Sequence, residues 1–387
     1  MQHNITTEVP PPSPHKLPER NNKMVKIFVT GATGYIGGDA LYAIATSHPE
    51  YDITALVRNS DKGAKVASQY ASVKLVYGDL DSVELIEQEA KVADIVCHFA
   101  NADHAPSAEA IIRGLSSHDA SSPGFYIHTS GTGLLMWEDM REGKSNNAIF
   151  GSQFREKIYD DLENVSDVTS LPDDAPHRKI DKIVLAAGKD LADRVKTAIV
   201  SPPCIYGPGR GPDNQRSHQV PELIRTSLEK GYVPKVNEGK TYWGHVHVHD
   251  LSALYLKLVE EAAAGGSTKE WPGKPAVWGA EGYYFCENGE HVWGEVSQLV
   301  ADEMKKQKFI DNADVRSITA EDAAERTPAG HLLWGANSRA RAKRGKELLS
   351  WKPEGVSLED EILRAVEDEA RRRGVRPGHA AVAAGDL

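Results

Sequence analysis

The chain has 387 residues, of which 40% are hydrophobic and 26% are charged, so it is long enough for one large core or for a large and a small one. Its formal net charge of −11, with no basic run that suggests a binding face, argues against a nucleic-acid-binding protein. No stretch approaches the apolar length of a membrane span, and we expect neither a secretory leader nor a membrane partner.

The three cysteines, Cys97, Cys204 and Cys286, are an odd number and lie far apart in the sequence. This spacing predicts neither a disulfide framework nor a metal site. A reducing, cytoplasmic compartment is therefore the expected location.

The most informative stretch begins with a β-branched apolar run at residues 26–30, continues with Gly31, Gly34 and Gly37, and ends in a helical segment at residues 39–47. A strand, a glycine turn and a helix in this order are typical of phosphate binding, because the turn lets the main chain approach an anion and the helix start offers free amides. A turn that only packs a helix on a strand needs the same glycines. The strand-helix alternation that follows favours phosphate binding.

A second buried strand at residues 51–59 ends near Arg58, with no Asp or Glu at the strand end. In a dinucleotide fold this position faces the adenosine ribose, where an acidic residue selects NAD and an arginine pairs with the 2′-phosphate of NADP. Arg58 therefore favours NADP, with NAD possible. The alternative is that Arg58 is a solvated charge. A third strand at residues 73–80 places Asp79 near the adenine edge.

Two further strands are expected at residues 94–101 and 125–132, with helices at residues 82–92 and 108–115. The first of these strands is almost continuously apolar, which indicates a parallel strand covered on both faces. His98 and Cys97 within it are interpreted as core residues. The second strand brings hydroxyl groups to its carboxyl end, where ligands bind in open α/β sheets, so these are candidate substrate contacts.

Residues 134–177 are polar and irregular, and a connection of that length is usually functional or mobile. A helix at residues 179–189 and a sixth strand at residues 196–201 follow, and the strand leads into the segment 202–210. The predicted fold is a doubly wound parallel sheet of the Rossmann type with a smaller C-terminal substrate region.

This pattern predicts that the chain is divided into four parts. Residues 1–23, with five prolines, are expected to be a disordered tail. Residues 24–205 form the dinucleotide-binding core, and residues 206–373 form the substrate region, with some strands and helices returning to the core. Residues 374–387 are expected to be a loose tail.

Alternate histidines, His245, His247 and His249, mark a short strand before a helix at residues 251–261, with Asp250 as its predicted N-cap. A zinc site is one interpretation of these histidines. No cysteine or carboxylate cluster supplies the other ligands, so the sequence favours histidines that face solvent or a substrate pocket. An aromatic group follows, and it suits an apolar pocket lining or core packing equally well. It consists of Trp271, Trp278, Tyr283, Tyr284, Phe285 and Trp293.

These motifs together resemble the extended short-chain dehydrogenase/reductase superfamily, the NAD-dependent epimerase/dehydratase group, from about residue 24 to about residue 351. Residues 30–37 resemble its cofactor turn, residues 127–132 the strand with its catalytic Ser or Thr, and residues 202–209 the segment that touches the nicotinamide. The resemblance implies a catalytic role for Ser130. The implied cofactor contacts, with Arg58 added from the strand end, are Gly31, Thr33, Gly34, Tyr35, Ile36, Gly37, Arg58, Asp79, Leu80, Phe99, Ala100 and Pro203.

The chain departs from the family at the catalytic helix, which carries Tyr-x-x-x-Lys so that the Lys cation lowers the pKa of the Tyr phenol. Here the Tyr position is His177 and the Lys position is Asp181. In one interpretation His177 is a substitute general acid/base and Asp181 orients its ring. In the other, proton transfer was lost and Asp181 pairs with Arg178 or Lys182. Tyr159 has no Lys at the matching offset.

The leading expectation is an NADP(H)-binding, atypical short-chain oxidoreductase acting on a small carbonyl or alcohol, with Ser130, His177 and Asp181 as the catalytic candidates. Two alternatives remain: a catalytically weak or inactive dinucleotide-sensing regulatory protein, and a nucleotide-sugar epimerase or dehydratase. The expected partner is a small-molecule substrate, with a homodimer possible.

Overall fold

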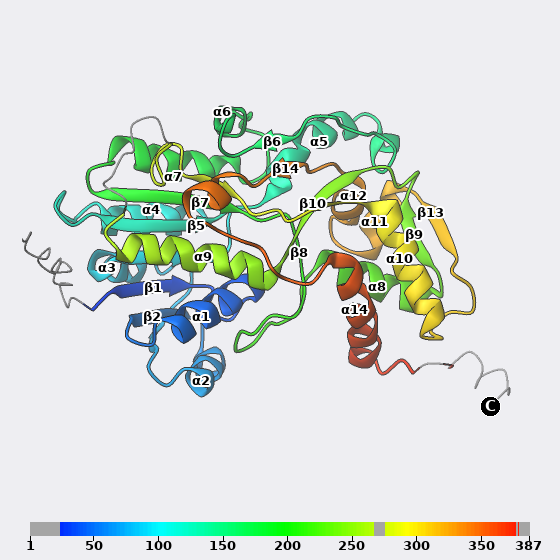
Figure 1. Ribbon diagram of the computed structural model, residues 1–387, viewed down its shortest axis with the longest axis horizontal. Helices are drawn as coiled ribbons and strands as arrows, with labels where there is room; N and C mark the ends of the chain where they lie inside the picture. Colours follow the sequence, from blue (N-terminus) through cyan, green and yellow to red (C-terminus); the bar gives the residue numbers. More distant parts are fainter. Residues whose placement is uncertain (1–23, 267–274, 377, 379–387) are drawn as a thin grey trace, which may run out of the picture.

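A computed structural model describes residues 24–266, 275–376 and 378. It contains a seven-stranded parallel sheet in the order β11-β7-β5-β4-β1-β2-β3, which confirms the predicted fold class (Figure 1). The predicted tail at residues 1–23 lies outside the described residues, as do Trp271 and most of residues 374–387. The strands are β1 (Lys26–Thr30), β2 (Asp52–Val57), β3 (Lys74–Tyr77), β4 (Ile95–His98), β5 (Gly124–Thr129), β7 (Val195–Ser201) and β11 (Tyr283–Phe285).

Helices cover both faces of this sheet (Figure 1). On one face α1 (Tyr35–Ser47) packs against α9 (Val248–Ala263), and on the other α4 (Ala105–Leu115) packs between α3 (Val83–Val92) and α7 (Arg178–Asp190). The central strands are buried on both faces, which explains their continuous apolar runs. The short helix α2 (Ser60–Gln69) follows β2, and the side chain of Asn59 caps its N-terminus.

The strand order reverses beside β1. The chain runs outward from β1 through β2 to β3, and then returns to the other side of β1 as β4. In open α/β sheets a ligand binds at the carboxyl ends of the strands at such a reversal. The glycine turn follows β1 and Phe99 follows β4, so the predicted cofactor residues meet at this place.

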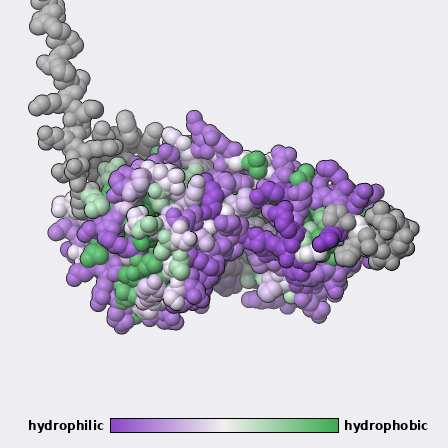
Figure 2. All heavy atoms as spheres, turned by 90° about the horizontal axis from the view of Figure 1, so that it is seen from below, coloured by the Kyte–Doolittle hydropathy of each residue, from purple (hydrophilic) through white to green (hydrophobic). Residues whose placement is uncertain are grey.

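The remaining chain builds a second hydrophobic core beyond the carboxyl ends of the sheet, on the right in Figure 1. Figure 2 shows a largely hydrophilic face, on which apolar side chains gather over the half that holds the parallel sheet. Besides the helices already named, the described chain contains α5 (Trp137–Gly143), α6 (Val165–Thr169), α8 (Gln219–Lys230), α10 (Trp293–Lys306), α11 (Ala320–Arg326), α12 (Gly330–Gly335), α13 (Arg344–Leu348) and α14 (Leu358–Arg372). The strands outside it are β6 (Tyr159–Asp160), β8 (Cys204–Tyr206), β9 (Val233–Val236), β10 (Tyr242–His247), β12 (Glu290–Val292), β13 (Val315–Ile318) and β14 (Ala340–Arg341).

Two local predictions were wrong. Residues 134–177 are less irregular than expected, because they contain α5, α6, β6 and two 3-10 turns. Asp250 is not the N-cap of α9: the helix begins at Val248, and the His247 side chain accepts a hydrogen bond from the amide of His249. The Asp250 carboxylate instead accepts hydrogen bonds from the amides of Glu354 and Gly355.

Other sequence features have plain structural outcomes. Cys97, Cys204 and Cys286 are free and buried. His98 is fully buried, and its Nδ1 lies 2.7 Å from the hydroxyl of Thr30, so it is a core residue as predicted. Within the described ranges, no helix combines the length and the apolar character that crossing a membrane requires.

Candidate active site

The glycine turn after β1 is packed tightly against the end of β4. Gly31 has φ +80°, and a Cβ atom there would lie 2.7 Å from the carbonyl carbon of Phe99. A Cβ at Gly37 would clash with the Gly31 carbonyl. Both glycines are therefore required for the close approach of α1 to the strand ends, whatever the turn binds.

Gly34 is different, because packing does not explain it as well. It is the N-cap of α1, it provides no capping side chain, and the first turn of α1 has no acidic residue. A Cβ at Gly34 would meet a single atom within 4 Å, the Gly31 carbonyl oxygen at 3.2 Å. The first turn of this 13-residue helix therefore has no acidic side chain of its own against its amides, which fits the pyrophosphate of a dinucleotide.

At the adenosine end, Arg58 stands directly after β2 and is exposed. Within the described part of the chain its guanidinium makes no hydrogen bond or ion pair, so it is available to an anion. The exposed Asp79 carboxylate accepts hydrogen bonds from the Asp81 amide and the Ser82 hydroxyl, and thus stabilises its own turn. Leu80 beside it is half-buried.

Residues 207–216, which we call the covering loop, lie against the glycine turn and the start of α1. The amide of Asn214 donates to the Thr33 carbonyl at 3.3 Å, and the hydroxyl of Tyr35 donates to the Gly207 carbonyl at 2.6 Å. Asp39, fully buried in α1, accepts two hydrogen bonds from the Arg210 side chain at 2.9 and 2.7 Å. This loop therefore joins the cofactor turn to the C-terminal region.

A pocket of about 500 Å³ opens between the glycine turn and the covering loop. Its apolar wall includes Ile36, Phe99 and Pro203, three of the predicted cofactor contacts. The rest of the described lining consists of Tyr35, Ile205, Asn214, residues 216–219 and Leu333. A volume of this size is typical of small-molecule sites.

Ser130 lies just beyond β5 in a buried cluster of hydroxyl groups around Asp181. The Ser130 hydroxyl donates to Asp181 Oδ2 at 3.1 Å, and the Tyr283 hydroxyl donates to the same oxygen at 2.9 Å. The Tyr283 hydroxyl also lies 3.3 Å from that of Ser201. These side chains come from β7, β11, the end of β5 and the first turn of α7.

The Asp181 carboxyl is a poor anion in this cluster. Burial raises its pKa to about 6, against the lowering effects of the Ser130 and Tyr283 hydrogen bonds and of His177. Its second oxygen, Oδ1, is buried and has no hydrogen-bond partner among the described residues. The carboxyl therefore gains or loses a proton at a higher pH than an ordinary aspartate, near pH 6.

His177 pairs with Asp103 and not with Asp181, which corrects one predicted contact. Its Nδ1 lies 2.9 Å from Asp103 Oδ1. The reason is local: His177 is the N-cap of α7 with φ 62°, so its side chain does not share a helix face with Asp181. Arg178 and Lys182 do not pair with Asp181 either, because they bind Leu171 and Asp173.

The free nitrogen of His177 points at the end of β5. Cβ atoms placed on Gly131 and Gly133 would lie 3.2 and 3.4 Å from His177 Nε2, and these glycines leave that space open. Burial alone lowers the pKa of His177, but the hydrogen bond and charge of Asp103, with the charge of Asp181, outweigh it and raise the pKa. His177 is therefore an oriented imidazole that holds its proton more firmly than an ordinary one.

The histidines near β10 have partners that explain them without a metal. His245 Nδ1 lies 3.1 Å from His291 Nδ1, and His249 Nε2 lies 3.0 Å from the Pro208 carbonyl oxygen. In the described ranges, no group of three or more histidine, cysteine, aspartate or glutamate side chains is arranged to hold a metal ion. Tyr159, which lies in β6, accepts a hydrogen bond from the indole N–H of Trp137.

Sequence reasoning missed three site residues. Asp103 follows the end of β4, a position where a ligand-facing residue is expected in such a fold, so the signal was available. Tyr283 was noted only within an aromatic group, and nothing in the sequence links it to Asp181. Arg216 carried no signal, because it stands in an irregular segment.

Comparisons with known proteins give the family. The NmrA-like family matches residues 23–113, and the NAD dependent epimerase/dehydratase family matches residues 165–271. Oxidase ucsJ from Acremonium sp. is 39% identical over 350 residues, which cover 90% of this chain and 99% of that protein. A dTDP-glucose 4,6-dehydratase from Mycobacterium tuberculosis is 23% identical over 253 residues, 62% of this chain and 70% of that protein.

Solved structures show the same fold at low sequence identity. A dTDP-glucose 4,6-dehydratase from Bacillus anthracis in complex with NAD has a TM-score of 0.60 and 17% identity, covering 90% of this chain and 98% of that one. A UDP-glucuronic acid 4-epimerase from Bacillus cereus in complex with UDP-glucuronic acid and NAD has a TM-score of 0.59 and 14% identity, covering 90% and 100%.

Proposed function

Because this chain belongs to the extended short-chain dehydrogenase/reductase superfamily, in its NAD-dependent epimerase/dehydratase group, we propose that it is an NADP(H)-dependent oxidoreductase acting on a small carbonyl or alcohol. The relative named as an oxidase, which spans nearly the whole chain, supports redox chemistry. The exposed Arg58 after β2 supports NADP rather than NAD, since a guanidinium pairs well with a 2′-phosphate.

One observation carries the catalytic part of the proposal: Asp103 holds one imidazole nitrogen of His177, and the other nitrogen lies beside Gly131 and Gly133, just beyond β5. An imidazole held by a carboxylate through one nitrogen is a common general acid/base arrangement. In the reducing direction His177 Nε2 would give a proton to the substrate oxygen, and in the oxidising direction it would take that proton back.

Other residues have supporting roles. The amides at the start of α1 and Arg58 would hold the dinucleotide, which supplies or accepts the hydride when bound. While Ser130 donates its proton to Asp181, its oxygen would accept a hydrogen bond from an alcohol substrate. When Asp181 is protonated it would donate to Ser130 instead, which frees the Ser130 proton to hold a carbonyl oxygen. Tyr283 does not replace the family's catalytic tyrosine, because burial and the neighbouring Asp181 raise the pKa of its phenol instead of lowering it.

The test is NADPH oxidation with a panel of aldehydes and ketones, followed by the His177→Asn variant. Asn tolerates a positive φ, so the backbone at residue 177 is preserved while the acid/base group is lost. We expect kcat to fall by about 10²- to 10⁴-fold with cofactor affinity unchanged. His48→Asn, at the end of α1, is the matched control and should keep full activity. Unchanged turnover in His177→Asn would refute the assigned role.

A second candidate is a dinucleotide-sensing regulatory protein. A buried carboxyl at the position of the family's lysine, with no cation in its place, favours it. The N-terminal match to the NmrA-like family is compatible with either function. NADPH binding without turnover across aldehydes, ketones and nucleotide sugars would support this candidate over the enzyme.

A further inference from the structure

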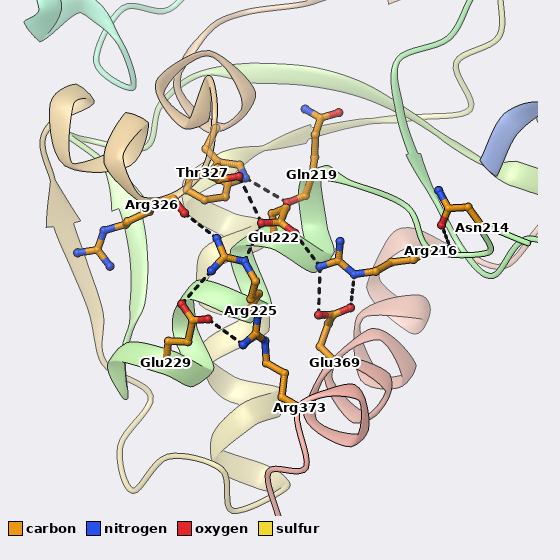
Figure 3. Close-up of polar contacts among 11 residues, drawn as sticks. Asn214, Arg216, Gln219, Glu222, Arg225, Glu229, Arg326, Thr327, Glu369 and Arg373 are labelled. Atoms are coloured by element: carbon orange, nitrogen blue, oxygen red, sulfur yellow. Dashed lines mark hydrogen bonds and ion pairs between the residues drawn. The ribbon is translucent and has the colours of Figure 1, made fainter. Parts of the chain in front are cut away.

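Among the described residues that line the pocket beside the glycine turn, Arg216 is the one permanent cation, and it is already paired with carboxylates. Arg216 lines this pocket together with Phe99 and Pro203. Its guanidinium donates to both carboxylate oxygens of Glu369, at 2.5 and 3.1 Å, and lies 2.9 Å from a Glu222 oxygen (Figure 3). Two carboxylates therefore face one guanidinium.

These carboxylates are fixed by their own partners. Glu222, on α8, also binds Arg225 at 2.7 Å and the Thr327 hydroxyl at 3.3 Å. Glu369, on α14, is almost fully buried. Releasing Arg216 to a ligand would leave Glu369 buried without a cation, and an unpaired buried charge is strongly unfavourable. Figure 3 shows how the network continues from Glu222 to Arg225 and from Arg225 to Glu229.

Three neutral polar side chains of the described lining also make hydrogen bonds within the protein. The Tyr35 hydroxyl donates to Gly207, the Asn214 side chain accepts from the Arg216 amide, and the Gln219 amide donates to the Leu333 carbonyl. The apolar wall consists of Ile36, Phe99, Pro203, Ile205 and Leu333. Of the lining side chains, His218 alone would become a cation on protonation.

We propose that this pocket selects an uncharged, largely apolar carbonyl or alcohol, and that Glu369 enforces the choice by neutralising Arg216. This inference rests on the proposed function and names its substrate class. A nucleotide diphosphate is bound most strongly by cations around its phosphates. Among the described lining side chains the only permanent cation, Arg216, is already paired with two carboxylates, which argues against a nucleotide-sugar substrate. Ile36, Phe99 and Pro203 are also expected cofactor contacts, so the room left for substrate is small.

The first experiment compares two substrates that differ in charge: methyl 4-formylbenzoate and 4-formylbenzoate, each with NADPH. We expect kcat/KM for the ester to exceed that for the acid by at least about tenfold, a difference of about 1.4 kcal/mol. In parallel, calorimetry with the NADP-saturated protein should show no binding of UDP at millimolar concentration. Equal turnover of ester and acid, or UDP binding under these conditions, would overturn the proposal.

Glu369→Gln is the decisive variant, because it keeps the side-chain shape and removes one carboxylate from Arg216. It should raise the ratio of kcat/KM for the acid to kcat/KM for the ester about tenfold. Glu229→Gln is the matched control: it removes a carboxylate from the same network, but one that contacts Arg225 and Arg373 instead of Arg216. If both variants shift the preference equally, the effect is general electrostatics and the assigned role of Glu369 is wrong.

If the protein is not an oxidoreductase, the experiments give a different result from the one expected when only the pocket proposal is wrong. Without that activity neither formylbenzoate is turned over, while direct binding still tests the pocket. Calorimetric titration of methyl 4-formylbenzoate and 4-formylbenzoate into the wild type should then show the ester binding more tightly. Glu369→Gln should reduce the difference in affinity between the ester and the acid. Tighter binding of the acid than of the ester to the wild type would overturn the inference without reference to catalysis.

Discussion

The hydroxyl of Ser130 donates a hydrogen bond to Asp181 at 3.1 Å, so the residue that replaces the family's lysine touches the candidate catalytic serine directly. In the family, the cation at that position lowers the pKa of a tyrosine. Here the side chain is a buried carboxyl that binds two hydroxyl groups. The acid/base group of this site must therefore be sought elsewhere, and His177 is the oriented candidate.

The pH dependence of reduction should depend on Asp103. Asp103 raises the pKa of His177 against the opposing effect of burial, and reduction needs the protonated imidazole. The rate constant kcat/KM should therefore fall as pH rises through that pKa. In Asp103→Asn the burial effect dominates, so the decline should move to lower pH by at least about one unit. A full pH profile of both proteins checks this, and an unmoved decline would contradict it.

Asp181 should make the protein less stable as pH rises from about 4 to about 6. Its pKa is raised from 3.8 to about 6 in the folded state, so the folded protein binds more protons than the unfolded chain in this window. The loss should be of order 2 kcal/mol. Urea unfolding at pH 4.5 and pH 7 should show this loss in the wild type and not in Asp181→Asn. Equal pH dependence in the two proteins would show that Asp181 is not responsible.

Gly34 and Gly37 should respond differently to alanine. Gly34 has φ −81° and one close neighbour, so Gly34→Ala should change the free energy of unfolding by no more than about 1 kcal/mol while weakening NADPH binding. Gly37→Ala places its Cβ against the Gly31 carbonyl and should lower both stability and binding. Thermal melts and fluorescence titrations separate the effects. Full NADPH affinity in Gly34→Ala would argue against a pyrophosphate at this helix start.

Arg58 should control the choice of cofactor. Arg58→Gln removes an exposed, unpaired guanidinium and should weaken NADPH binding by about 10- to 100-fold, the value of one or two charge-assisted hydrogen bonds. NADH binding should not change. Arg113→Gln, on α4, is the control for loss of an exposed charge. If the wild type binds NADH more tightly than NADPH, Arg58 is only a solvated charge.

The sequence predicted the residues that obey local rules. The turn at Gly31 and Gly37 and the strand ends were found because glycine turns and apolar runs have a regular pattern. The role of Ser130 came from the family resemblance and stays a prediction. The contacts of His177 were not predictable in this way. Its positive φ directs the ring to Asp103, 74 residues earlier, and no helical spacing reveals that pairing.

Long-range pairs were invisible for the same reason. Tyr283 meets Asp181 across 102 residues, and Arg216 meets Glu369 across 153. Only the packing of the C-terminal region against the sheet brings them together. The presence of a charged residue in the sequence therefore does not show whether its side chain is free to bind a ligand.

The return of β11 to the large sheet has a consequence for how the chain can be divided. A fragment ending at residue 205 would contain the complete glycine turn, but β7 would become an open edge, since β11 normally pairs with it. The same cut would remove α9, which covers α1. We therefore expect such a half-length protein to aggregate on expression, and the two halves to refold only when they are produced together.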